Sequence, residues 1–156
     1  MSEKLEISFN SPQCGWMSVG FSAGAKEFHT TTAHAPHEEA LAELLGILSN
    51  LFGADDFEKT LKWNRDPEAY DFVFHKNGSR TQLEIIEYPT EDRETRTAEK
   101  VFSYEGGTRE ISKAFYETFR QLYAEREADE FEQNWRQPFP LDEFQNFENK
   151  IKNQGQ

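Results

Sequence analysis

Apolar and polar residues alternate over seven short stretches of the chain, as they do in strands that bury one face. We expect strands over residues 5–9, 16–21, 26–32, 57–63, 70–75, 81–88 and 99–104. Asn77-Gly78 separates two of these stretches, and this dipeptide favours the tight turn of a β-hairpin. The alternation therefore predicts a sheet that includes hairpins.

Three other segments repeat apolar residues at intervals of three and four positions, as the buried face of a helix does. We expect helices over residues 36–53, 109–126 with an extension as far as 135, and 141–151. Pro36 suits the first turn of a helix, and Thr108 is placed to cap the second one. Pro138 and Pro140 separate the second helix from the third.

The order of these segments is strands, one helix, more strands and then helices. This order predicts a single α+β domain over residues 1–152, followed by a frayed tail at 153–156. We expect a mostly antiparallel sheet, with the central amphipathic helix and the C-terminal helices packed on it. The chain has 156 residues and fourteen phenylalanines, which is enough to bury one substantial core.

The charge changes this picture, because the chain carries a formal net charge of −12. Residues 125–148 hold eight acidic and two basic residues, and so contribute half of that charge. Phosphate groups would be repelled by such a chain, so direct binding to nucleic acid or to an anionic membrane is disfavoured. A basic protein is the natural partner.

The N-terminal sequence shows no secretion signal, and no apolar run is long enough for a membrane span. Cys14 is the single cysteine, so an intrachain disulfide is excluded. These features predict a cytoplasmic protein, and its oligomeric state stays open.

Candidate chemistry is sparse. His29, His34 and His37 are close in sequence and are residue types that bind transition metals, but their spacing matches no common zinc motif. Cys14 would need a histidine beside it to act as a nucleophile, and no serine lies in a GxSxG motif. We therefore expect neither an enzyme nor a bound cofactor or metal. A metal-binding protein or enzyme that uses the three histidines is the alternative.

The acidic C-terminal region also contains aromatic residues, and aromatic anchors ringed by charge are common in protein interfaces. Trp135 and Phe139 flank the break at residues 137–140, where the sequence does not fix whether they are buried, and we take them as candidate interface anchors. The predicted partner-binding residues are Glu125, Glu127, Asp129, Glu130, Glu132, Trp135 and Phe139.

The strand residues Gly15-Trp16-Met17-Ser18-Val19, the leucine-rich central helix and the stretch 138–144 together give a small, acidic α+β chain without a catalytic motif. In this it resembles the immunity proteins of bacterial toxin–immunity systems. The resemblance implies a protein that neutralises a cognate, often basic, nuclease toxin by stoichiometric binding. It assigns no individual contact residue.

Two further functions stay open from the sequence. An adaptor for a basic partner unrelated to toxins would have the same surface character. The many phenylalanines would also suit a domain that encloses an apolar pocket for a small molecule, although a core needs them equally.

Overall fold

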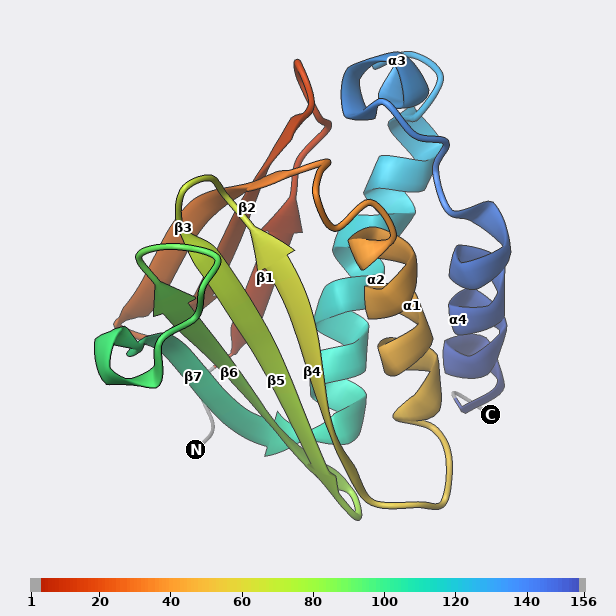
Figure 1. Cartoon of the computed structure of the whole chain (residues 1–156). Coiled ribbons are helices and arrows are strands. Elements are labelled where there is room, and N and C mark those ends of the chain that lie inside the picture. The colour runs from red at the N-terminus through yellow and green to blue at the C-terminus, as the bar shows by residue number, and fades with distance from the viewer. Residues whose placement is uncertain (1–3, 155–156) are drawn as a thin grey trace.

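The computed structural model describes residues 4–154, which form two antiparallel sheets and four α-helices (Figure 1). The first sheet has three strands in chain order: β1 (Leu5–Phe9), β2 (Trp16–Ala23) and β3 (Lys26–Ala33). The second sheet has four strands in chain order: β4 (Phe57–Asn64), β5 (Ala69–Asn77), β6 (Arg80–Tyr88) and β7 (Glu99–Gly107). The predicted α+β class with antiparallel pairing is confirmed, although the strands divide between two sheets.

The helices are α1 (Ala40–Asn50), α2 (Thr108–Glu125), α3 (Phe131–Trp135) and α4 (Leu141–Gln154). A short 3-10 helix, η1 (Thr95–Thr97), interrupts the connection before β7. Figure 1 shows α1, α2 and α4 together on one side of the sheets, with α3 set apart beyond the end of α2. Strand β1 lies along α2, and α1 lies beside α4.

The two sheets face each other across aromatic side chains. The ring of Phe21 on β2 lies 6.0 Å from Phe72 on β5 and 5.6 Å from Phe102 on β7, between ring centroids. Phe115 of α2 closes the same cluster from the helical side, 6.3 Å from Phe21. The abundant phenylalanines therefore serve as core, and large rings supply much buried area per residue.

Several predicted boundaries shift. Helix α1 begins at Ala40 rather than Pro36, because the preceding residues form a turn in which His37 accepts a hydrogen bond from the Ala40 amide at 3.1 Å. Thr108 does not cap α2, because its hydroxyl bonds to that of Thr81 at 2.8 Å. The hairpin turn falls on Gly78-Ser79, since Asn77 pairs with Arg80.

The C-terminal predictions also change. Helix α2 ends at Glu125, and α3 is a separate helix rather than an extension of it. Helix α4 continues through Asn153 and Gln154, two residues that we had assigned to a frayed tail. The rest of that tail lies outside the described residues.

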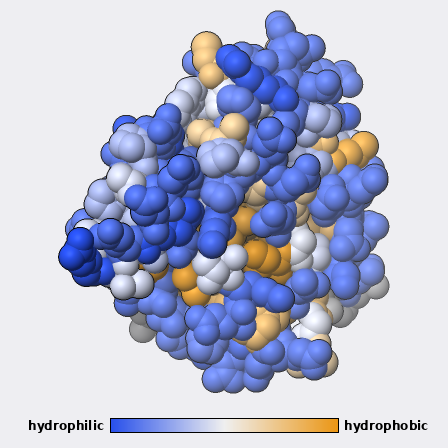
Figure 2. Space-filling model, viewed as in Figure 1, coloured by the Kyte–Doolittle hydropathy of each residue, from blue (hydrophilic) through white to orange (hydrophobic). Residues whose placement is uncertain are grey.

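Much of the surface is hydrophilic, as expected from the charge. Figure 2 shows a mostly hydrophilic face, with smaller hydrophobic areas between β4 and α1 and where the chain enters α4. Among the helices that the structure describes, none is both long and apolar enough to cross a membrane.

Candidate binding surface

The five carboxylates predicted to bind a partner lie together where α2 ends and α3 begins. All five are exposed. Asp129 accepts a hydrogen bond from the Ser11 hydroxyl at 2.6 Å, and Glu125 accepts one from the Gln121 amide at 3.3 Å. Within residues 4–154, none of the five forms an ion pair, so their charge faces solvent.

Trp135 is buried, contrary to its prediction as an interface anchor. Only 1% of the residue is exposed, and its ring centroid lies 6.1 Å from that of Trp63 and 6.4 Å from that of His34. The physical reason is that α3 turns its apolar side inward, where Phe131 is also buried. Trp135 therefore anchors α3 to the core, and it meets the surface only as part of the wall of a hollow toward α1.

Phe139 is half-buried and contributes to both the core and the surface. Its ring centroid lies 5.3 Å from Phe131, 5.8 Å from Tyr123 and 5.6 Å from Phe144. These contacts fix the segment Pro138–Leu141, which we call the apolar ridge. Leu141, at its end, is 39% exposed, one of the two large hydrophobic residues exposed in the described chain.

A hollow of about 460 Å³ lies on the α3 side of the apolar ridge. Its apolar part is formed by Phe131, Pro138, Phe139 and Leu141. Three carboxylates predicted from the sequence line it as well: Glu127, Glu130 and Glu132. The guanidinium of Arg126 is the one basic group in this lining. Aliphatic and aromatic surface is thus bordered by negative charge, as expected for an interface with a basic partner.

A second hollow of about 410 Å³ lies on the opposite side of the same ridge, toward α1. Four exposed carboxylates line it: Glu38, Glu39, Asp142 and Glu143. Sequence reasoning missed this hollow, because the first two lie about 100 positions before the others and suited the start of a helix. The stretch 138–141 could have indicated this hollow from the sequence. It contains two prolines and two large apolar residues, it has acidic residues before and after it, and prolines favour an exposed connection between helices.

The carboxylates around the ridge have no cationic partner within the described part of the chain, whereas some acids elsewhere do. Glu84 contacts Lys100 at 2.6 Å, and Asp71 contacts Arg93 at 2.9 Å. Of the seven carboxylates in the two hollows, none forms an ion pair within the described residues. Arg126 lies 4.0 Å above the centre of the Tyr123 ring and donates to the Tyr123 carbonyl at 2.6 Å. This surface therefore carries an unbalanced negative charge.

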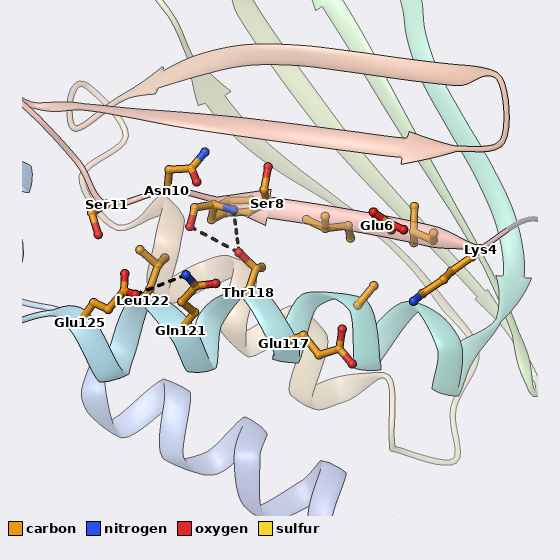
Figure 3. A pocket seen from close by; sticks show the side chains of 14 residues that line it. Lys4, Glu6, Ser8, Asn10, Ser11, Glu117, Thr118, Gln121, Leu122 and Glu125 are labelled. Carbon is orange, nitrogen blue, oxygen red and sulfur yellow. Dashed lines mark hydrogen bonds between the residues drawn. The ribbon is translucent and has the colours of Figure 1, made fainter.

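A separate polar groove of about 370 Å³ runs between β1 and α2 (Figure 3). Across it, the Thr118 hydroxyl accepts a hydrogen bond from the Phe9 amide at 2.7 Å and lies 3.4 Å from the Phe9 carbonyl, to which it donates. Helix α2 thereby covers the outer edge of β1, which protects that edge from pairing with other strands. The groove also contains Glu6, Glu117 and Glu125, so it extends the acidic surface along α2.

The three histidines do not form a metal site. His29 is exposed on β3, whereas the His34 ring faces the Gly15 carbonyl at 3.1 Å, on a different part of the molecule. Partial burial, assisted by the nearby charge of Arg93, lowers the pKa of His37. Throughout residues 4–154, no three His, Cys, Asp or Glu side chains come together in a group that could hold a metal ion.

One serine–histidine–glutamate arrangement lies on the open face of the first sheet. His29 Nε2 lies 2.5 Å from Glu27 Oε1, and both His29 and Ser8 lean over Gly20, which has no side chain to displace them. The side chains of His29 and Glu27 are 62% and 65% exposed. Nucleophilic catalysis is favoured by an enclosed, water-excluding site with oxyanion donors, whereas these two side chains are largely in contact with solvent.

The comparisons with known proteins add no assignment. No family model, curated protein or solved structure matches the chain. The function must therefore be inferred from the surface itself.

Proposed function

We propose that this protein is a non-catalytic binding protein that neutralises a basic protein, of the nuclease-toxin kind, by forming a stoichiometric complex. The supporting observation is the unpaired negative charge around the apolar ridge: seven exposed carboxylates border two hollows that meet at Phe139 and Leu141. Like charges held this close repel one another and destabilise the folded chain. A cationic partner relieves that repulsion.

The same charge gives the interaction its speed. A surface of one sign raises the association rate of an oppositely charged protein by roughly 10 to 1,000 fold, and salt weakens the effect. A nuclease holds phosphate in a cationic cleft, so carboxylates that enter this cleft exclude the substrate. Fast capture suits a protein that must inactivate a toxin before it acts.

The test uses the product of the reading frame immediately upstream, co-expressed with this chain. We expect that product to arrest growth alone, to be tolerated with this protein, and to form an equimolar complex with it. A charge-reversed variant, Glu127→Lys with Glu130→Lys and Glu132→Lys, should lose protection and bind more slowly at about 50 mM salt.

The matched control reverses three exposed carboxylates that form no ion pair within the described residues, with the same change in net charge: Asp55→Lys, Glu58→Lys and Glu99→Lys. These residues lie at or just before the first residues of β4 and β7, strands whose N-terminal ends lie away from α3 (Figure 1). This variant should protect the cell and bind nearly as fast as the unchanged protein. Equal rates for both triple variants would refute the proposed surface. A basic partner that binds tightly but is harmless to cells would identify an adaptor instead.

A further inference from the structure

We infer that the apolar ridge Pro138–Leu141 recognises a protein segment in which two arginine or lysine residues flank an aliphatic or aromatic residue. This inference rests on the proposed function and specifies the partner's chemistry. In the expected complex, the apolar residue contacts Leu141 and Phe139 on the ridge. The two basic side chains then enter the hollows on either side of it.

The lining of each hollow fits a long basic side chain. Arginine and lysine have apolar stems that pack along hydrophobic surface and a charged head that stays hydrated or paired. On the α3 side, such a stem would lie against Pro138 and Phe139, with its head near Glu127, Glu130 and Glu132. The aromatic ring of Phe139 also favours a guanidinium over its face.

The α1-side hollow offers the same combination. Its apolar lining includes Leu41, Pro138 and Leu141, and its carboxylates come from residues 38–39 and 142–143. The described lining contains no Lys or Arg that would already neutralise these groups. A single basic residue could pair with the carboxylates of one hollow only. The two hollows together therefore favour a partner segment that has two basic residues.

The ridge is held in place before any partner arrives. Gln137 donates to the His34 carbonyl at 2.9 Å, and the Pro140 carbonyl accepts the Phe144 amide at 3.0 Å in the first turn of α4. Proline also fixes its own backbone φ angle. A rigid surface loses little conformational entropy on binding, which favours affinity from a small contact area.

Other occupants fit less well. Nucleic acid and anionic membranes are repelled by the carboxylates. A metal ion lacks a converging set of ligands among the described residues. A polyamine matches the charge, but it carries no separate apolar side chain for Leu141.

The probes are two synthetic peptides of equal charge, one repeating Arg-Leu-Arg and one repeating Arg-Ser-Arg, together with spermine as the polyamine. Calorimetry at low salt should show that the leucine peptide binds at least about tenfold more tightly than the serine peptide, because an apolar side chain is buried. Spermine should bind more weakly than the leucine peptide.

Leu141→Ser is the decisive variant, because it removes the exposed apolar group and leaves every charge in place. Serine is well tolerated where a helix begins, so α4 should still form. The variant should abolish the preference for the leucine peptide. Glu130→Lys and Glu143→Lys should each lower the affinity for the leucine peptide several-fold, whereas Glu58→Lys should leave that affinity unchanged.

The outcomes separate the two proposals. One outcome is that charge reversal weakens the binding of both peptides while Leu141→Ser leaves the ratio of their two affinities unchanged. In that case the inference about the ridge is wrong, and the proposal of a basic partner is retained. If only one of Glu130→Lys and Glu143→Lys has an effect, the two-sided arrangement fails. Tighter binding of spermine would show that the surface takes polyamines, and no binding of either peptide at low salt would refute a basic partner altogether.

Discussion

Replacing Trp135 tests whether its indole is structural, as its burial indicates. The side chain is 1% exposed and packs edge-on against Trp63, with 73° between the ring planes. Truncation of a buried tryptophan costs about 3–5 kcal/mol, from lost burial and the cavity that remains. Trp135→Phe leaves most of the volume filled and should cost about 1–2 kcal/mol, because about 50–75 Å² less apolar surface is buried at ~25 cal/mol per Å².

Urea unfolding followed by circular dichroism measures both effects. With an m value of about 2 kcal/mol per molar urea, Trp135→Ala should lower the midpoint by about 2 M and Trp135→Phe by less than about 1 M. Trp135→Phe should leave affinity for the leucine peptide unchanged. Trp16→Ala is the comparison: Trp16 is 38% exposed, so its loss should lower the unfolding free energy by clearly less than the loss of Trp135 does.

The opposite pattern would refute this reasoning. If Trp135→Phe weakened peptide binding tenfold while the urea midpoint stayed constant, the indole would have to reach the partner. The prediction from the sequence that Trp135 contacts the partner would then be right, through the wall of the α1-side hollow that Trp135 lines.

Three further contacts give testable magnitudes. Thr118→Val leaves the Phe9 amide without its acceptor and should cost about 1–3 kcal/mol in urea unfolding, with faster hydrogen exchange at that amide. Arg93→Met leaves the Asp71 carboxylate unpaired where both side chains are about 15% exposed, so we expect a loss of roughly 2–4 kcal/mol, partly recovered by adding Asp71→Asn. Burial raises the pKa of Tyr116 to about 12, so folding favours the neutral phenol. That stabilisation is complete below the unfolded pKa of about 10 and is lost as the pH rises to 12, by roughly 1–2 kcal/mol after allowing for solvent screening. Tyr116→Phe should remove this component from stability measured across that pH range.

Alternation along the chain was sufficient to predict the strands. Each predicted strand is present, because residues such as Met17, Val19 and Phe21 must all leave water on the same side. The division into two sheets was not predictable in this way. It depends on which strands pair, and the connection through α1 between β3 and β4 separates the two groups without any local signal.

The break between α2 and α3 could have been read from helical geometry. At about 100° per residue, Phe131 would lie roughly 180° around a continuous helix from Leu122 and would face solvent. The observed chain instead turns at Glu130, whose φ of +51° lies in the left-handed region. That turn brings Phe131 and Trp135 into the core. Counting angular positions, rather than spacing alone, distinguishes one long helix from two.

This turn also explains why the predicted carboxylates are exposed whereas Trp135 is buried. A buried aromatic residue contributes far more to folding than an exposed one, so Phe131 and Trp135 are drawn inward wherever the backbone permits. Carboxylates are not buried in the core unless a cationic or hydrogen-bonding partner is buried with them, because the loss of their hydration is costly. They remain at the surface, and the apolar group beside them is the ridge, where Leu141 is exposed. On the proposed function, we therefore expect the charge to set how fast a partner arrives at this surface and the exposed atoms of the ridge to set which partner stays bound.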